Sequence, residues 1–375
     1  MLYGVVFSAE ELAFRDSVAA AVAAPSDRSV RQYFLGRGGA SRALYRELGE
    51  RGWLSLSWPL SFGGRDLPLS YEFLLWDTLA YRRACRPDIG PGLIARVLIE
   101  HGTRQQQDKY LPALAEGSLA CSLGYSEPAA GSDLTHLRTR ATRHGDSYVV
   151  HGHKIWTSEA HHATKLWLLC RTGDNDSGKR GLTILFVDLR DPQIHISPIP
   201  TMDGHQLNEV VLDGVVVPVE ERVGAEGGAW EIIVRSLAVE RHTQVLPGRL
   251  RRDLEELWRS LRDAGLADDG WVRHVMEELE GEFAAVEASS LATVSELVAG
   301  GDAVIPAARS KYLAAALSQK IARVGLDLLG TGGVIDDSEL AFLWRQCVAE
   351  GIAGGTLEVM ISMLARQGLQ LGSTR

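Results

Sequence analysis

The spacing of apolar residues changes twice along this chain. Residues 1 to about 119 follow a helical period, and Ser8 and Glu11 form the capping-box pattern typical of a helix start. From about residue 121 to 223, short apolar runs alternate with turn residues, as strands do. After Gly224 the helical period returns and continues to the end of the sequence. This order predicts a β-domain between two helical domains.

Five apolar runs define the predicted β-domain: 148–150, 165–170, 182–187, 195–199 and 208–212. Asp213 and Gly214 precede three valines and give a strong hairpin signal, because Asp-Gly suits a two-residue turn. We predict an N-terminal all-α domain, a middle β-domain and a C-terminal all-α domain, with bounds 1–119, 120–225 and 226–375. The helical period of the last domain is interrupted at 266–270, 299–306, 330–333 and 354–355.

Composition excludes several classes of protein. The 375 residues are 45% hydrophobic, which is enough for a large core, and the net charge is -9 with no run of Lys or Arg. Nucleic acid and anionic membrane are therefore not expected as partners. The cysteines lie far apart and form no metal-binding or disulfide pattern: Cys85, Cys121, Cys170 and Cys347. Without a basic leader or an apolar run of membrane length, we expect a cytoplasmic protein.

Residues 124–133 form an irregular segment that combines hydroxyls, acids and glycines beside a predicted strand. Their order is Gly-Tyr-Ser-Glu-Pro-Ala-Ala-Gly-Ser-Asp. Backbone N–H groups in such a loop can bind phosphate or carbonyl oxygens, and Gly131 permits close approach. On these residues alone, a solvated loop explains the segment equally well.

A second segment places an aromatic ring beside two hydroxyls. Trp156, Thr157 and Ser158 follow the predicted strand 148–150 and a His-Gly turn. An indole can pack on a planar ring while the hydroxyls serve its nitrogens, which suits a flavin. The alternative is a core tryptophan beside turn residues.

Charged residues continue an apolar stripe on the helix expected after Gly228. The stripe has helical spacing and consists of Trp230, Ile233, Val234 and Leu237. The next positions on that face are Glu240 and Arg241. A buried carboxyl group has a raised pKa, as a general base at neutral pH requires. Most Glu-Arg pairs on helices are simply solvated, so both interpretations stay open at this point.

These segments, together with Gly354-Gly355-Thr356-Leu357-Glu358 near the C-terminus, resemble the acyl-CoA dehydrogenase family along almost the whole chain. The resemblance implies an α+β fold with an N-terminal helical domain, a middle β-domain and a C-terminal four-helix-bundle domain, and it implies FAD as the cofactor. By position, the flavin-binding residues would be Leu123, Gly124, Tyr125, Ser126, Gly131, Ser132, Trp156, Thr157, Ser158, Thr356 and Glu358. Ser158 would bond near flavin N5, and Ser132 would also lie close to the thioester.

The resemblance also implies a relocated catalytic base. Many family members have a catalytic Glu before the Gly-Thr pair, where this sequence has Gly354. In a branch that includes the isovaleryl- and long-chain enzymes, the base comes from a Glu-Arg pair on the helix after the β-domain. Glu240 and Arg241 match that pair. Glu240 would then take the α-proton, Arg241 would position it and the substrate, and the Gly354 N–H would stabilise the enolate oxygen.

Two departures concern subunit contacts. The Arg-x-Phe-Gly element of many members is absent, since the corresponding positions read Arg252-Asp253-Leu254-Glu255, and Asp327 stands where a Gln is usual. These features are similar to an actinobacterial branch of sterol and specialised-metabolite dehydrogenases, some of them heteromeric. Expected partners are an acyl-CoA or acyl-carrier-protein thioester, an electron-transfer flavoprotein or similar acceptor, and further subunits in a homo- or hetero-oligomer (dimer or tetramer).

Three alternatives stay open from the sequence. The first is the same chemistry on a carrier-protein thioester, the second a non-catalytic subunit of a heteromeric enzyme, and the third a flavin monooxygenase or oxidase. No metal site is expected. The histidine pairs His151 with His153 and His161 with His162 fall in strand and turn segments without an acidic or cysteine complement, and we interpret them as structural.

Overall fold

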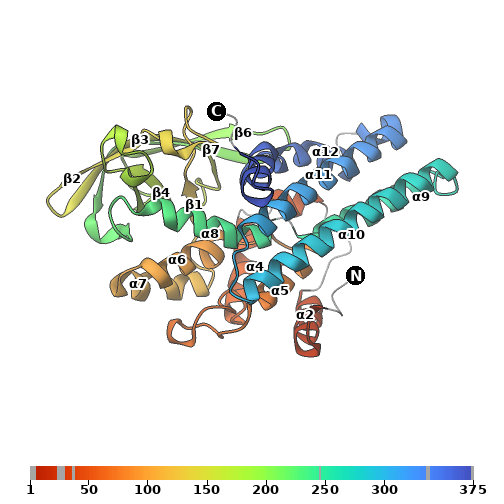
Figure 1. Ribbon diagram of the computed structural model, residues 1–375, viewed down its shortest axis with the longest axis horizontal. Coiled ribbons are helices and arrows are strands. Elements are labelled where there is room, and N and C mark those ends of the chain that lie inside the picture. Colours follow the sequence, from red (N-terminus) through yellow and green to blue (C-terminus); the bar gives the residue numbers. More distant parts are fainter. Residues whose placement is uncertain (1–5, 23–29, 36–38, 245, 335–337, 373–375) are drawn as a thin grey trace. The chain divides into compact units, whose positions relative to one another are not determined.

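The computed structural model describes residues 6–22, 30–35, 39–244, 246–334 and 338–372, and it consists of helices and one sheet (Figure 1). This confirms the α+β class. The chain divides into two compact units. Unit 1 comprises Met1–Gly36, Leu67–Pro87 and Ala238–Arg375, and unit 2 comprises Arg37–Asp66 and Asp88–Leu237. The three predicted domain bounds stay a prediction.

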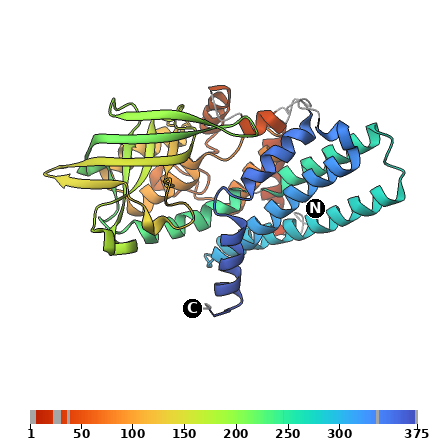
Figure 2. The ribbon, with the colours of Figure 1, turned by 90° about the horizontal axis from the view of Figure 1, so that it is seen from above.

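In the described part of unit 2, eight strands form one sheet (Figure 2). Their order is β6-β7-β3-β2-β4-β5-β8, with β1 paired to β4 in parallel. All five predicted apolar runs lie in strands. The bounds are β1 (Cys121–Gly124), β2 (Arg140–His144), β3 (Ser147–Ser158), β4 (Lys165–Arg171), β5 (Leu182–Asp188), β6 (Ile194–Pro200), β7 (Gln206–Pro218) and β8 (Arg222–Val223).

The predicted hairpin turn at Asp213 and Gly214 is wrong. Both residues lie inside β7, which pairs continuously with β3, and the register shifts there because Val150 faces Val215 whereas His151 faces Asp213. Gly214 has φ of +78°, so the glycine serves a β-bulge instead of a turn. The tight turn of this region is at residues 145–146, between β2 and β3.

Apolar side chains cover both faces of the sheet. Trp167 of β4 and Phe186 of β5 contact edge-to-face with ring centroids 5.8 Å apart, and Tyr110 lies 4.7 Å from Phe186. Leu166 and Leu168, the alternate residues of β4, belong to the cluster on the other face. Burial on both faces explains why residues 165–170 are apolar without alternation.

Helices supply the rest of unit 2. Their bounds are α4 (Gly39–Glu50), η1 (Leu60–Phe62), η2 (Gly90–Ile94), α6 (Ala95–His101), α7 (Arg104–Ala115), η3 (Leu134–His136), η4 (Asn175–Gly181) and η5 (Val219–Glu221). Helix α8 (Ala229–Gln244) begins in unit 2, where Ile232 and Ile233 join the same core as Trp167. Val234 is exposed, so the predicted apolar stripe of this helix is only partly buried.

Unit 1 is helical throughout its described residues. Its elements are α2 (Ala9–Ala21), α3 (Val30–Leu35), α5 (Leu69–Tyr81), α9 (Pro247–Asp263), α10 (Gly270–Val298), α11 (Val304–Leu329), η6 (Gly330–Val334), α12 (Glu339–Glu350), α13 (Leu357–Met363) and η7 (Leu364–Gly368). The capping box at Ser8 and Glu11 is confirmed at the start of α2. Among the helices that the structure describes, none is both long and apolar enough to cross a membrane.

A buried network of charges joins three segments of unit 1. The Arg249 guanidinium binds both carboxylate oxygens of Glu350 at 2.6 and 2.8 Å. Arg83 lies 3.2 Å from Asp253 and is 1% exposed. Asp253 lies in the segment that lacks the Arg-x-Phe-Gly element, so this chain uses that helix for an internal ion pair. The Lys311 ammonium donates to the Glu350 carbonyl at 2.8 Å, which anchors the end of α12 just before Gly354.

Candidate functional site

A buried ion pair holds the two sequence segments of unit 2 together. The Lys154 ammonium, which is 0% exposed, lies 2.8 Å from the Glu127 carboxylate and also donates to the Tyr125 carbonyl at 3.1 Å. The Ile155 N–H donates to the Ser126 carbonyl at 2.9 Å. Residues 125–127 are therefore fixed against the end of β3, whereas residues 128, 129 and 131–133 are exposed.

The Glu127 carboxylate is saturated with donors. Besides Lys154, it accepts hydrogen bonds from the backbone N–H groups of Arg138 at 2.6 Å and Thr139 at 2.9 Å. Burial tends to raise the pKa of Glu127, but the Lys154 charge and these hydrogen bonds outweigh it and lower that pKa. Glu127 is thus ionised in the folded protein, and its role is to position the segment instead of exchanging protons.

Trp156 is held out of the sheet by its backbone. The pairing of β3 with β7 shifts between Lys154 and Thr157, so Trp156 lies in a β-bulge. Its φ is +61°, a left-handed conformation that is rare for an aromatic residue, and its side chain is 55% exposed. Strained backbone of this kind is concentrated at functional sites. The prediction that Trp156 follows a strand and a His-Gly turn is wrong, because His151, Gly152 and Trp156 all lie within β3.

The two hydroxyl residues after Trp156 are anchored through their carbonyls. Asn208 Nδ2 donates to the Thr157 carbonyl at 3.0 Å, and Ser122 Oγ donates to the Ser158 carbonyl at 2.8 Å. The Thr157 hydroxyl oxygen is buried and has no hydrogen-bond partner within the described residues. An exposed indole beside a buried, unsatisfied hydroxyl fits a planar group with hydrogen-bonding edges. These residues therefore fit the expected flavin.

The Gly-Ser-Asp triplet follows a tight turn. Glu127 and Ala130 exchange two backbone hydrogen bonds, at 2.8 and 3.0 Å, which close the turn. Gly131 and Ser132 are exposed, and their backbone N–H groups donate to no other residue in the described part of the chain. Asp133 begins η3, since its carboxylate accepts from the Thr135 N–H at 2.9 Å. Gly131 and Ser132 are thus available to a ligand, whereas the Asp133 side chain has a structural contact.

The remaining predicted site residues belong to unit 1. Glu240 lies in the last turns of α8, half-buried, with its Oε2 atom shielded from solvent. Its backbone carbonyl accepts from the Thr243 hydroxyl at 2.9 Å. Arg241 follows on the same helix. Glu240 therefore combines a shielded carboxylate oxygen with a helical backbone, as a positioned base requires.

Gly354 lies in the turn between α12 and α13. Gly354 and Gly355 have φ of +69° and +98°, conformations that glycine adopts without strain. Thr356 caps α13 by accepting from the Val359 N–H at 3.2 Å, so its hydroxyl is partly committed. Glu358 is exposed in the first turn of α13. The structure therefore gives Thr356 a structural contact beside its predicted contact with flavin.

Sequence reasoning missed several residues that position this site. Glu127, Lys154 and Asn208 are all buried polar side chains that bind the segments around Trp156. The sequence contains a Glu in the first segment and a Lys two residues before Trp156, but nothing in their spacing shows that they form a pair. The expectation that no acidic residue accompanies His161 and His162 is also wrong, because Glu159 begins the same turn.

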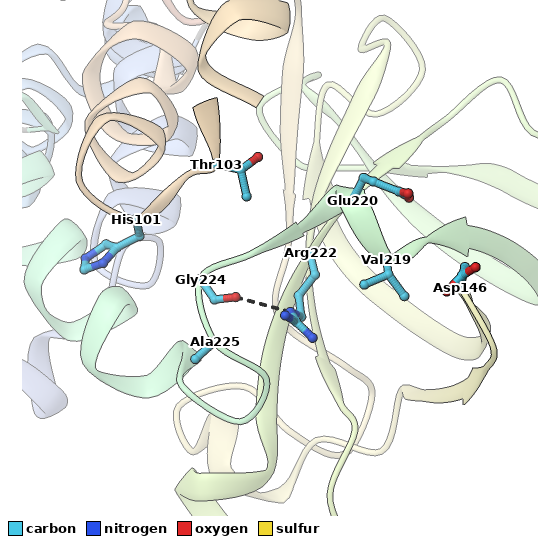
Figure 3. Close-up of a pocket in the computed structure, with 8 residues that line it drawn as sticks. All are labelled: His101, Thr103, Asp146, Val219, Glu220, Arg222, Gly224 and Ala225. Atoms are coloured by element: carbon cyan, nitrogen blue, oxygen red, sulfur yellow. Dashed lines mark hydrogen bonds between the residues drawn. The ribbon is translucent and has the colours of Figure 1, made fainter. Parts of the chain in front are cut away.

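A separate hollow in unit 2 contains none of the predicted site residues. It has a volume of about 510 Å³ and is open to solvent, and Figure 3 shows His101, Thr103 and Arg222 at its edge. The Arg222 guanidinium donates to the Gly224 carbonyl at 3.2 Å and to the Tyr148 hydroxyl at 3.1 Å, so it is directed at the protein itself. This hollow is a surface feature distinct from the segments around Trp156.

Comparisons with known proteins agree with these observations. Family models match for the acyl-CoA dehydrogenase N-terminal domain over residues 8–118, the middle domain over 122–215 and the C-terminal domain over 227–369. "Acyl-CoA dehydrogenase FadE26" of Mycobacterium tuberculosis is 30% identical over 356 residues, which cover 90% of this chain and 89% of that protein.

Two solved structures are similar over nearly their whole length. The "Tcur3481-Tcur3483 steroid ACAD" has a TM-score of 0.88 and 28% identity, and the match covers 97% of each chain. The ChsE4-ChsE5 complex from Mycobacterium tuberculosis has a TM-score of 0.89 and 28% identity, covering 98% of this chain and 99% of that one. The protein described here therefore belongs to the acyl-CoA dehydrogenase family, whose members are flavin oxidoreductases acting on CH–CH groups.

Proposed function

We propose that this protein desaturates an acyl thioester between Cα and Cβ, in an FAD-dependent reaction that yields the trans-2-enoyl thioester. The observation that carries the proposal is the exposed Trp156 indole, which a strained bulge holds beside the buried Thr157 hydroxyl. Such a surface suits a flavin ring, and bound FAD would supply the hydride acceptor. Leu123, Gly124, Tyr125 and Ser126 would line the same group, since Ile155 and Lys154 hold this segment against β3.

Glu240 would remove the α-proton. The family resemblance motivates this role, and a carboxylate with a shielded oxygen at a helical position supports it. The α-proton becomes acidic only if the developing enolate oxygen is stabilised, and the Gly354 N–H would donate to that oxygen. Gly354 has no carboxylate, but it keeps its backbone N–H as a donor. Glycine also adopts the positive φ of this turn without strain. Ser132 and Arg241 would orient the thioester.

The substrate is proposed to be a bulky acyl-CoA, such as the CoA thioester of a steroid side chain. Support for this substrate comes from the similar structure named a steroid ACAD. The similar ChsE4-ChsE5 complex supports a hetero-oligomer as a second part of the proposal. Electrons would leave through an electron-transfer flavoprotein or a similar acceptor. A carrier-protein thioester and a non-catalytic subunit are the alternatives to separate by experiment.

The test is an anaerobic titration of the purified protein, followed by its flavin absorbance. The panel consists of short, branched, long and steroid-side-chain acyl-CoAs, together with a carrier-protein thioester of matching acyl group. The proposal expects a yellow protein that bleaches with a member of the CoA series, and mass spectrometry should show a product lighter by two hydrogens. Bleaching with the carrier-protein thioester alone would assign the other carrier. If the protein retains no flavin after incubation with FAD and removal of the excess, this would contradict the proposal and favour the supporting-subunit alternative.

A further inference from the structure

The turn that follows Ser158 gathers groups suited to a metal ion. Glu159, His161 and His162 each offer one ligand atom, and these atoms all lie within 4.8 Å of one another. The two imidazole rings have centroids 4.0 Å apart. His205, from the segment between β6 and β7, adds a third imidazole, with Nε2 3.1 Å from Glu159 Oε1. We propose that Glu159, His161 and His162 bind a divalent transition metal, with Zn²⁺ as the best match, and that His205 supports the site.

The backbone holds the three ligands in a short arc. The N–H groups of His162 and Ala163 both donate to the Glu159 carbonyl at 2.9 Å, which closes the turn. Glu159 itself has φ of +60°, a left-handed conformation, and its carboxylate oxygen lies within 4.8 Å of the ligand atoms of both histidines. Tetrahedral coordination with bonds of about 2.1 Å places ligand atoms about 3.4 Å apart. The three ligand atoms now lie within 4.8 Å of one another, so metal binding would draw the side chains closer together.

Two neighbouring residues contact the proposed ligands Glu159 and His161 and restrict their side chains. The Asn208 side-chain amide lies 3.1 Å from His161 Nδ1 and holds that ring against the turn. His205 is mostly buried, and its contact with Glu159 keeps the carboxylate directed at the histidines. Outer contacts of this kind orient metal ligands and raise affinity. His205 can serve as this outer partner or as a fourth ligand.

The composition of the cluster indicates which ion it would take. Imidazole nitrogens with a carboxylate suit Zn²⁺, Ni²⁺ or Cu²⁺, whereas Mg²⁺ and Ca²⁺ prefer all-oxygen sites. The contact between Glu159 and His205 is enough by itself to join the turn to the segment between β6 and β7. It does not explain why the exposed His161 and His162 also lie beside Glu159. A structural ion pair therefore explains part of the cluster, and a metal site explains all of it.

The site lies next to the segment proposed to contact flavin, because only Thr157 and Ser158 separate Trp156 from Glu159. Trp156 and Glu159, at the two ends of residues 156–159, both have a left-handed backbone conformation. A bound metal would stabilise the turn and so favour the strained conformation that exposes Trp156. The proposal concerns metal binding itself and does not depend on the proposed reaction.

The test is a calorimetric titration with ZnCl₂. The protein is first purified and then treated with a chelator to remove any bound metal. We expect one Zn²⁺ per chain with micromolar affinity, weakened at least about tenfold in His162→Ala and His161→Ala and by about tenfold in His205→Gln. Glu159→Gln is the conservative variant if an alanine variant fails to fold, and circular dichroism verifies folding. Substituting Co²⁺ should give the visible absorption bands of a four-coordinate site in the unmodified protein but not in His161→Ala or His162→Ala.

The control is the double variant His151→Ala, His153→Ala. These histidines also contact carboxylates, Asp213 at 3.4 Å and Glu209 at 2.5 Å, but lie outside the cluster. The control should bind Zn²⁺ like the unmodified protein. The proposal is overturned if no Zn²⁺ binds, or if folded His162→Ala and Glu159→Gln variants bind it as tightly as the unmodified protein does.

Discussion

Replacing Glu127 by Gln tests whether the buried ion pair positions the segments around Trp156. Lys154 is 0% exposed, so the variant would leave its ammonium in the interior without a counter-charge. Removing one partner of a buried pair costs about 3–5 kcal/mol of unfolding free energy. Glutamine also brings an N–H₂ group toward the N–H groups of Arg138 and Thr139, which now donate to the carboxylate. We therefore expect a loss of at least about 3 kcal/mol.

Urea denaturation of the FAD-free protein measures this loss, with the slope of the transition compared between variants to verify that the same surface unfolds. The matched control is Asp108→Asn, which removes the exposed ion pair with Arg104. The side chains of Arg104 and Asp108 are 74% and 59% exposed, so this variant should change the free energy of unfolding by less than about 1 kcal/mol. The double variant Glu127→Gln, Lys154→Met should lose less than the sum of its single variants, because it leaves no unpaired charge. A loss below about 1 kcal/mol in Glu127→Gln would mean that Lys154 does not depend on Glu127 as its counter-charge.

The same pair predicts a pH dependence with a definite sign. The pKa of Glu127 is lowered from its ordinary value of 4.5, so its ionised form stabilises the folded state. That contribution is fully present above pH 4.5 and is lost as the pH falls through the lowered folded-state pKa. The stability difference between the unmodified protein and Glu127→Gln should therefore be constant near neutral pH and shrink below pH 4.5. A difference that stays constant throughout the acid range would contradict the assignment.

Further substitutions test other parts of the structure. Trp156→Gly should weaken FAD binding at least about tenfold in a fluorescence titration. The thermal stability of the FAD-free variant should be equal or higher, because glycine relieves the positive φ, and lower stability would argue against backbone strain at this residue. Gly131→Ala should weaken FAD binding without changing stability, since an added Cβ would meet no atom of the described protein within 4 Å; unchanged FAD binding would remove Gly131 from the site. Gly214→Val should cost about 1–3 kcal/mol in urea denaturation because a β-branched residue resists φ of +78°, and no loss would mean that the bulge relaxes. Asp253→Asn should cost about 1–3 kcal/mol, because Arg83 and Arg249 lose this carboxylate but keep Glu339 and Glu350; a loss above about 4 kcal/mol would contradict this compensation.

Local signals in the sequence predicted the elements well. The capping box at Ser8 and Glu11, the apolar runs of the sheet and the helix breaks all depend on neighbours in the chain, so spacing and composition reveal them. Asp213 and Gly214 misled because the same dipeptide suits a hairpin turn and a bulge. Only the partner strand decides between these, and β3 pairs with residues on both sides of Gly214.

The candidate site was predictable in its residue types but not in its supports. Trp156 and its hydroxyl neighbours were identified from an aromatic and polar pattern. Strand pairing brings Asn208 of β7 to the Thr157 carbonyl of β3. The segment after β1 brings Glu127 to the buried Lys154. Long-range pairings of this kind leave no trace in local spacing. The cluster of Glu159 with His205 was missed for the same reason.

The central claim, that Glu240 is the base of an acyl thioester dehydrogenase, is tested most directly by the rate of flavin reduction in a stopped-flow experiment. The substrate is whichever acyl-CoA bleaches the unmodified protein, and the variants are Glu240→Gln and Glu231→Gln, which changes an exposed Glu on the same helix. We expect Glu240→Gln to bind FAD normally but its flavin to be reduced about 10²–10⁴-fold more slowly, while Glu231→Gln stays within about twofold of the unmodified protein. Reduction of the folded, FAD-bound Glu240→Gln variant at the unmodified rate would contradict it.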